Sequence, residues 1–306
     1  MKRVVAIALF CAGCAAPRTP PRVPDSEQYL PPDIEAISLL GKPLHSPELG
    51  PAEQKRREDE LAKAQREYEM NPDSADAALV VGDRLADLGR YREAIDVFTD
   101  AIRKHPDDAR LYRDRGHRDI NVRRFREALN DLQFAELARA KSDDAERQQI
   151  FYHLGLAYYL LGDFEKALAA YRRSLPLAKT PDRLVATTDW TYMTLRRLGR
   201  TQEAEKLLEP ISIDLEVVDS VAHHKLLLMY EGEIAPEELV KQDANTTDGA
   251  TILYGIGNWY FINGQPDRAN PLWRKILDGS QAFSFGYVAA EAEMARLDKA
   301  HPSPSQ

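Results

Sequence analysis

Residues 79–106 read LVVGDRLADLGRYREAIDVFTDAIRKHP, and the positions that matter for helix packing recur 34 residues later. Gly82 recurs as Gly116. Four more positions keep an aromatic, small or bulky apolar residue at this spacing: Tyr91 and Phe125, Ala94 and Ala128, Phe98 and Leu132, and Ala101 and Ala135. A period of 34 residues is typical of stacked pairs of antiparallel helices. The sequence therefore predicts an all-α solenoid.

This unit resembles the tetratricopeptide repeat (TPR). By that resemblance, Gly82 lets the first helix pack closely, Gly89 ends that helix, and Pro106 closes the pair. Further copies are expected in four stretches, at residues 151–175, 185–210, 218–240 and 251–277. The resemblance implies a TPR-type helix-turn-helix solenoid over residues 73–299, with about five to six helix pairs and one degenerate pair near residues 218–249. Residues 282–299 are expected to form a C-terminal capping helix, followed by a tail at residues 300–306.

The N-terminus predicts export and lipidation. It reads MKRVVAIALFCAGC, a charged start followed by an apolar run that is far shorter than the roughly 20 residues needed to span a bilayer. The last four residues resemble the lipobox of bacterial lipoproteins, with Cys11 where leucine is usual. We therefore expect residues 1–13 to be a signal peptide and Cys14 to be lipidated; a plain cleaved signal and an uncleaved anchor are the alternatives. The expected location is the cell envelope, as a periplasm-facing outer-membrane lipoprotein if the cell is Gram-negative.

Residues 15–50 are rich in proline, which favours an extended, semi-rigid tether. Within them the stretch EAISLLGKPL, at residues 35–44, is too apolar for a solvated linker. We expect Ile37, Leu39 and Leu40 to dock on the folded domain; an unstructured apolar patch is the alternative. A helix is predicted over residues 51–72, with proline at its first position.

Charge and motifs exclude several functions. The 306 residues carry 41 Lys and Arg against 49 Asp and Glu, a net charge of −8, which disfavours nucleic acid as a partner because phosphates attract basic proteins. Motifs for nucleotide loops, zinc proteases, serine hydrolases and calcium loops are missing from the sequence. The histidines lack the spacing that places two imidazoles on one helical face. We expect no enzymatic activity, no cofactor and no metal site.

The first helices of TPR pairs line a concave groove that receives peptides or partner helices. The resemblance assigns to this groove Asp83 and ten candidate partner-binding residues, which are Arg113, His117, Asn121, Tyr152, Tyr159, Asp189, Met193, Arg196, Tyr254 and Asn258. A solvated concave wall without a partner is the alternative for each of them. The carboxylate clamp of chaperone-binding TPR proteins needs a lysine and an asparagine where Leu79 and Asp83 stand, so that ligand is excluded.

Residues 111–126, LYRDRGHRDINVRRFR, carry charge where the other repeats carry apolar residues. Arg113 and His117 are expected to face the groove. Arg115 and Asp119 fall on the core side, where the first repeat has Val81 and Leu85. We expect Arg115 and Asp119 to form a structural ion pair, because a buried charge is stable only when it is paired.

These features favour a non-catalytic scaffold or adaptor, tethered by lipid, that binds a protein or peptide of unknown identity in its groove. With the stretches at residues 35–44, 115–118, 152–168 and 254–265, the chain resembles bacterial TPR lipoproteins, including a TPR group without an assigned activity. Two alternatives stay open. One is an accessory lipoprotein of an outer-membrane or pilus assembly machine, and the other is an enzyme or small-ligand receptor with a polar site around Arg113, His117 and Asp189.

Overall fold

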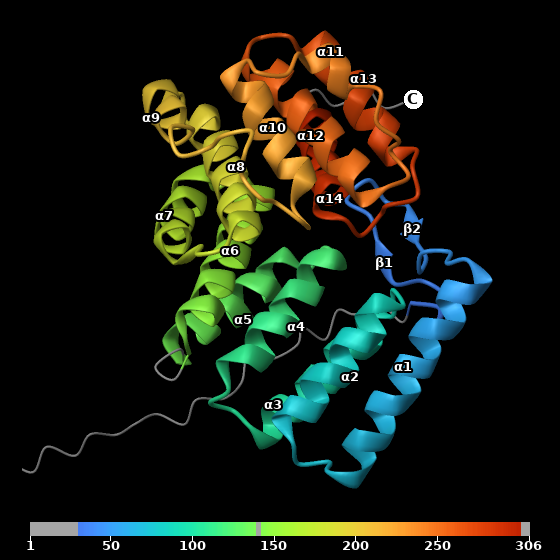
Figure 1. Cartoon of the computed structure of the whole chain (residues 1–306). Coiled ribbons are helices and arrows are strands. Elements are labelled where there is room, and N and C mark those ends of the chain that lie inside the picture. The colour runs from blue at the N-terminus through green and yellow to red at the C-terminus, as the bar shows by residue number, and fades with distance from the viewer. Residues whose placement is uncertain (1–29, 139–141, 301–306) are drawn as a thin grey trace, which may run out of the picture.

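A computed structural model describes residues 30–138 and 142–300, and shows an all-α solenoid of antiparallel helix pairs (Figure 1). The six pairs within these residues are α2 (Ala75–Asp87) with α3 (Tyr91–Lys104), α4 (Ala109–Asn121) with α5 (Phe125–Ala138), α6 (Asp144–Leu161) with α7 (Phe164–Ser174), α8 (Pro181–Arg197) with α9 (Thr201–Lys206), α10 (Val221–Glu231) with α11 (Pro236–Leu239), and α12 (Thr247–Ile262) with α13 (Pro266–Leu277). Helix α1 (Pro51–Met70) precedes them, α14 (Phe285–Ala300) follows them, and a short 3-10 turn η2 (Leu175–Leu177) extends α7.

Small residues explain why each pair closes. A side chain on Gly155 would place its Cβ 2.6 Å from Cε1 of Tyr171, so the close contact of α6 with α7 requires a glycine. Gly82 and Phe98 make the same contact between α2 and α3. At the turns, Gly162 has φ +82°, a left-handed conformation that side chains disfavour. The glycine pattern of the sequence therefore encodes the geometry of single pairs.

The fifth pair lies where the repeat pattern of the sequence is weak, and its second helix is short. Helix α11 has only four residues, and α9 in the pair before it has six. The loop between α9 and α10 supplies Leu208 and Ile211 to the core in place of a longer second helix. The solenoid therefore has a thinner outer layer in this part than in its first three pairs.

Helix α14 closes the solenoid in two directions. It packs on α12 and α13, where the first helix of a next pair would lie, and its other side contacts α6. All ten residues from Gly286 to Ala295 are buried as a result. Helix α12 also contacts α8, so the concave side between α6, α8, α12 and α14 is filled with side chains.

The segment before α1 does not form an extended tether over residues 30–50. Strands β1 (Ala36–Ile37) and β2 (Pro43–Leu44) pair antiparallel, and Figure 1 shows this hairpin beside the C-terminal helices. Ala36 and Leu44 are buried against Ile95, Val122 and Phe283.

Two of the three side chains that were expected to dock this segment on the domain do not do so. Ile37 and Leu39 are 42% and 38% exposed, and only Leu40 packs on the core. Side chains alternate between the two faces of a strand, so Ala36 and Ser38 face the domain where Ile37 faces away.

None of the helices within residues 30–138 and 142–300 is long and apolar enough to cross a membrane. The predicted signal peptide and Cys14 lie outside the described residues.

Candidate functional site

The concave side has a groove between successive first helices. It has a volume of about 540 Å³. Its lining comes from α2, α4, α6 and α8 and from the residue before α10: Asp83, Arg113, Asp114, His117, Arg118, Gln148, Gln149, Tyr152, His153, Asp182, Arg183, Ala186, Thr187 and Ser220. We call this cavity the groove. A volume of this size is in the range of pockets that bind ligands.

A second cavity of about 650 Å³ adjoins the groove, and both are lined by His117 and Arg118. We call it the adjoining pocket. Its other walls are the segment from Pro47 to Leu49, helix α2, Tyr91, and the loop from Ser280 to Phe285. The groove is largely polar, whereas the adjoining pocket offers several aromatic and aliphatic surfaces.

Three of the ten predicted groove residues, Arg113, His117 and Tyr152, line the groove together with Asp83. Asn121 lines the adjoining pocket, where it is buried and donates a hydrogen bond to the carbonyl oxygen of Phe283 at 2.8 Å. Of the ten predicted residues, these four line the groove or the adjoining pocket.

The other six predicted residues do not line the groove. Tyr159, Asp189, Met193, Tyr254 and Asn258 are at most 1% exposed, and Arg196 is bound to Tyr192 and Asn263 near the ends of α8 and α12. Their placement on an open floor was wrong, because α12 and α14 pack against the first helices that were expected to be open.

Aromatic side chains fill this closed region. The rings of Tyr159 and Trp190 meet edge to face at 5.1 Å, Trp190 stacks on Tyr254 at 5.8 Å, and the hydroxyl of Tyr254 donates to that of Tyr159 at 2.8 Å. Below them, Glu293 of α14 pairs with Arg197 of α8, which also donates to Asn258. The cluster is therefore interhelical core, in which stacked and edge-to-face rings pack closely.

Arginines and aspartates alternate in the groove. Arg113 donates two hydrogen bonds to Asp114, at 2.6 and 2.8 Å. Arg118 approaches Asp83 at only 3.4 Å, and its Nε is buried without a hydrogen-bond partner among the described residues. Burial, together with the nearby carboxylate of Asp114, raises the pKa of Asp83. The guanidinium of Arg118 is therefore incompletely hydrogen-bonded at the wall of the groove.

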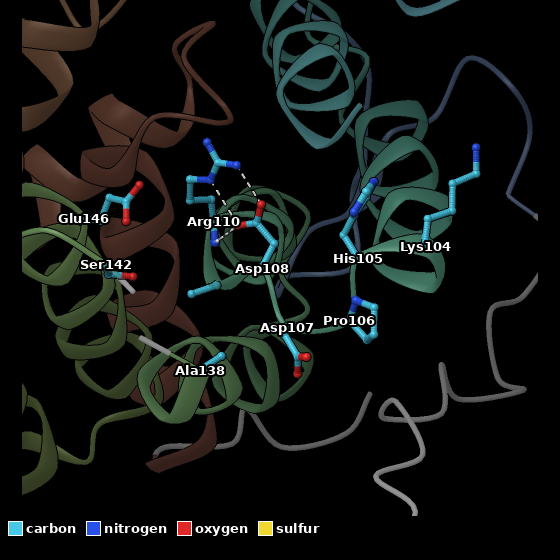
Figure 2. A pocket seen from close by; sticks show the side chains of 10 residues that line it. Lys104, His105, Pro106, Asp107, Asp108, Arg110, Ala138, Ser142 and Glu146 are labelled. Carbon is cyan, nitrogen blue, oxygen red and sulfur yellow. Dashed lines mark hydrogen bonds and ion pairs between the residues drawn. The ribbon is translucent and has the colours of Figure 1, made fainter. Parts of the chain in front are cut away.

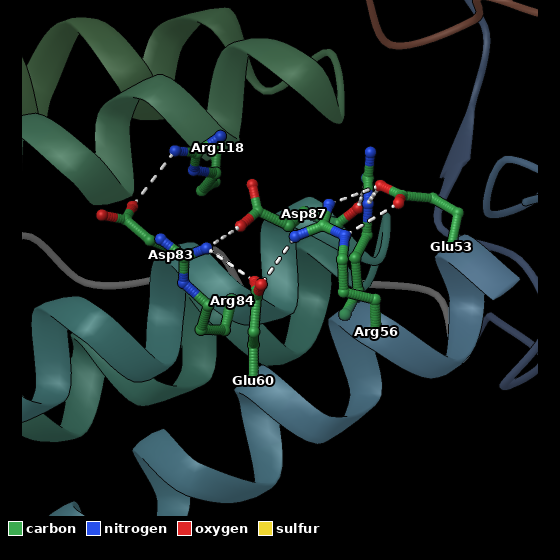
Figure 3. A network of polar contacts seen from close by, with 8 residues as sticks. Glu53, Arg56, Glu60, Asp83, Arg84, Asp87 and Arg118 are labelled. Carbon is green, nitrogen blue, oxygen red and sulfur yellow. Dashed lines mark hydrogen bonds and ion pairs between the residues drawn. The ribbon is translucent and has the colours of Figure 1, made fainter.

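A polar network between α1 and α2 lies near the contact of Arg118 with Asp83 (Figure 3). Arg84 bridges Asp87 at 2.8 Å and Glu60 of α1 at 3.2 Å, and Arg56 of α1 binds Glu60 at 2.6 Å. These side chains are partly exposed, so the network orients α1 against α2 more than it stabilises the fold.

Two imidazoles stack at the far wall of the groove. The rings of His117 and His153 are 4.3 Å apart, and the ring of Phe285 covers both at 5.3 and 6.1 Å. Burial lowers the pKa of His153 to about 3 and lowers that of His117 well below its usual value. Both rings are therefore neutral at pH 7, which allows them to stack.

The predicted ion pair between Arg115 and Asp119 was wrong. Arg115 binds Asp131 of α5 through two hydrogen bonds of 2.6 and 2.7 Å and donates a third to Thr99 of α3. The closest cation to Asp119 is Arg124, at 3.7 Å. Asp131 on the partner helix α5 is better placed to bind Arg115 than Asp119, which lies four residues further along α4.

Sequence reasoning missed the contact between His223 of α10 and Asp189 of α8, in which the imidazole Nδ1 lies 2.7 Å from the carboxylate. Neither spacing nor motif indicates it, because the two residues come from different pairs. Within residues 30–138 and 142–300, no group of three or more histidine, cysteine, aspartate or glutamate side chains could hold a metal ion.

A third cavity, of about 560 Å³, lies outside the groove at the turn between α3 and α4 (Figure 2). Its cations are already bound: Arg110 donates to Asp108 at 2.7 and 3.0 Å, and Lys104 donates to the carbonyl oxygen of Pro72 at 2.6 Å. Asp108 also caps α4 by accepting from the backbone of Arg110. These contacts serve the turn rather than a ligand.

Comparison with known families identifies the repeats. A tetratricopeptide repeat model matches residues 149–180, and a second one matches residues 55–109 and 79–117. The chain is 33% identical over 112 residues to an Hsp70-Hsp90 organizing protein of Triticum aestivum, which is 37% of this chain and 18% of that relative. The chain thus spans less than a fifth of the length of that relative.

Among solved structures, YrrB, described as a TPR protein with an unusual peptide-binding site, covers 76% of this chain and 97% of its own at 17% identity and a TM-score of 0.42. The apo form of the quorum sensor NprR from B. thuringiensis covers 74% and 82% at 15% identity and a TM-score of 0.37. From the family matches, the chain contains tetratricopeptide repeats.

Proposed function

We propose that this chain is a non-catalytic scaffold that binds an extended segment of a partner protein in the groove. The proposal is carried by one observation: within residues 30–138 and 142–300, polar side chains of the successive first helices α2, α4, α6 and α8 line a groove of about 540 Å³ on the concave side. The rest of the concave side is filled by α12 and α14. The groove therefore offers polar side chains from four successive first helices to a partner on the concave side.

The lining suits a peptide backbone more than a highly charged ligand. Arg113, Arg118 and Arg183 are opposed by Asp83, Asp114 and Asp182, so the groove has cations and anions in equal number. Guanidinium and amide groups such as those of Arg183 and Gln149 can donate to the carbonyl oxygens of an extended chain. The adjoining pocket then offers space for an apolar side chain of the same segment.

The chaperone named with the plant relative is not the partner that we propose. The chain has Leu79 and Asp83 at the positions where a carboxylate clamp needs a lysine and an asparagine. The family matches support protein binding as the kind of function, and partner identity has to come from experiment.

Peptide selection tests the groove directly. A phage-displayed library of random dodecapeptides is selected on the purified chain, and the selected peptides are measured by fluorescence anisotropy. We expect Arg183→Ala to weaken binding about tenfold or more, since a hydrogen bond to a charged group is worth about 1.5–3 kcal/mol. The side chain of Arg183 makes only a 3.5 Å contact with the carbonyl oxygen of Ala145, so its loss leaves the fold intact.

The matched control is Arg172→Ala, which removes an arginine from the second helix α7, where it binds Glu203 outside the groove. Equal loss of binding in both variants would refute the groove as the binding site. Crosslinking and mass spectrometry of the tagged chain in its own cell would then identify the natural partner.

We also propose that the chain is a lipoprotein of the cell envelope, attached through Cys14. The lipobox-like stretch before Cys14 and the short apolar run support this. Labelled fatty acid should be incorporated into the wild-type chain and not into Cys14→Ser, and that variant should leave the membrane fraction. Membrane retention of unlabelled Cys14→Ser would refute the lipid anchor.

A further inference from the structure

The turn of the second pair has an arginine where the other five pairs have glycine. Gly89, Gly162, Gly199, Gly232 and Gly264 all have positive φ angles between +71° and +90°. Arg123 takes the same place with φ +67°, and among the described residues no other non-glycine residue has a positive φ. This backbone conformation is strained for a residue with a Cβ, so contacts of the side chain have to offset the strain.

The side chain of Arg123 reaches the C-terminal helix. Its Nε and Nη2 both lie 2.8 Å from Oε2 of Glu291 in α14, and Nη2 donates to the carbonyl oxygen of Ala282 at 2.6 Å. The guanidinium also lies over the rings of Phe283 and Tyr287. The two charged side chains are 3% and 1% exposed, so the pair is buried in the seam between the second repeat and the end of the solenoid.

The second oxygen of Glu291 holds the N-terminal segment. Its Oε1 accepts a hydrogen bond of 2.7 Å from the backbone N–H of Leu39, in the loop of the hairpin. The same segment is fixed to the first repeat, because Glu35 is buried and accepts from the backbone N–H of Arg92 at 3.0 Å. One buried carboxylate therefore joins a segment near the start of the chain, the second repeat and the last helix.

We propose that Glu291 and Arg123 form a latch that couples docking of residues 30–50 to the seating of α14 and so keeps the solenoid closed. The latch lies beside the adjoining pocket, one wall of which is the docked segment from Pro47 to Leu49, and another the loop that Arg123 contacts. When the latch opens, the hairpin leaves, this pocket loses a wall, and the helix pairs stay folded. The proposal is independent of what the groove binds.

Hydrogen exchange of the full-length chain tests the latch, with Glu291→Met as the variant. Methionine keeps the length of the side chain and removes both the charge and the acceptor. We expect exchange in residues 30–50 and at the start of α14 to rise roughly tenfold or more, because Leu39 loses a hydrogen bond to a charged group. Exchange in α2, α3, α6 and α7 should stay within about twofold of the wild type.

Glu293→Met is the matched control. Glu293 lies two positions further on the same helix and is buried to 3%, but it binds Arg197 and Arg296. This control should loosen α14 against α8 and leave residues 30–50 protected. Equal deprotection of residues 30–50 in both variants would refute the latch, because any weakening of α14 would then have the same effect.

The single variant Glu291→Met leaves the charge of Arg123 buried without its partner, so the double variant Arg123→Gly with Glu291→Met is tested as well. It leaves no charge buried alone, and glycine suits the left-handed turn. We expect helical content like that of the wild type, a segment 30–50 that trypsin cleaves faster, and a larger radius of gyration in X-ray scattering. A double variant that keeps residues 30–50 protected, or that loses its helices altogether, would overturn the proposal.

Discussion

The variant Arg115→Leu tests which carboxylate Arg115 pairs with in the second repeat. The change removes two hydrogen bonds from Arg115 to Asp131 and one to Thr99, and it leaves the carboxylate of Asp131 buried. The side chains of Arg115 and Asp131 are 8% and 4% exposed. Breaking a buried pair by removing one partner costs about 3–5 kcal/mol, and we expect a value near the lower end because the carboxyl group can take up a proton instead.

Because Asp131 can be protonated, the loss of folding stability in Arg115→Leu depends on pH. Burial already raises the pKa of Asp131 against the lowering effect of Arg115, and without the arginine this pKa rises further. A carboxyl group whose folded pKa is raised contributes stability that is present below its unfolded pKa and is lost as the pH rises through the folded value. The cost of Arg115→Leu should therefore be larger at pH 8 than at pH 5.

Urea unfolding followed by circular dichroism measures this cost, with the free energy compared at unchanged m value. A double-mutant cycle with Asp131→Asn should give a coupling of about 1–3 kcal/mol, and a cycle with Asp119→Asn a coupling near zero. Arg103→Leu is the control, because its pair with Asp100 is exposed and worth less than about 1 kcal/mol. Stronger coupling of Arg115 to Asp119 than to Asp131 would refute this account.

Three further predictions concern groups in the same repeats. Burial lowers the pKa of His153 to about 3, against roughly 6.5 when unfolded, so stability should be lost as the pH falls from about 6.5 towards 3, by at most about 1.4 kcal/mol per pH unit from this group. His153→Phe should flatten this slope in urea midpoints measured across that range, and an unchanged slope would contradict the assignment. Burial raises the pKa of Asp119 well above its usual value, so its favourable contribution is present below about pH 4 and lost as the pH rises. Asp119→Asn should therefore raise the melting temperature at pH 8 and change it little at pH 4, whereas a lower value at pH 8 would show that the carboxylate is stabilising. Gly155→Ala should cost about 1–3 kcal/mol in urea unfolding, because the new methyl group would lie 2.6 Å from the ring of Tyr171, and a cost below about 0.5 kcal/mol would show that this ring can move aside.

Much of the fold could be predicted because its determinants are local. Gly82 and Gly116, 34 residues apart, mark close helix contacts within single pairs, and glycine marks the left-handed turn of five of the six pairs. The weak pattern near residues 218–249 coincides with the short helix α11. The 34-residue period also indicates which residue lies opposite Arg115. Arg115 and Asp131 stand where the first repeat has Val81 and Val97, so one apolar contact between helices is replaced by one charged contact.

The candidate site was only partly predictable. Arg113, His117 and Tyr152 line the groove, because the register of the repeat determines which face of each first helix is concave. Tyr159, Tyr254 and Asn258 have the same register and are buried. Register specifies the direction of a side chain, and it does not specify what lies opposite.

The sequence by itself determined the helix pairs, their turns and the concave face of each repeat, since each of these depends on residues within one or two repeats. Only the tertiary structure decided how far the solenoid closes. Closure results from small rotations of each helix pair relative to the one before it, added over six pairs that include the short helices α9 and α11. No single stretch of sequence therefore encodes it. That sum brings Glu291 to Arg123 and Leu39, buries most of the residues expected in the groove, and leaves three of the ten in the groove between α2 and α8.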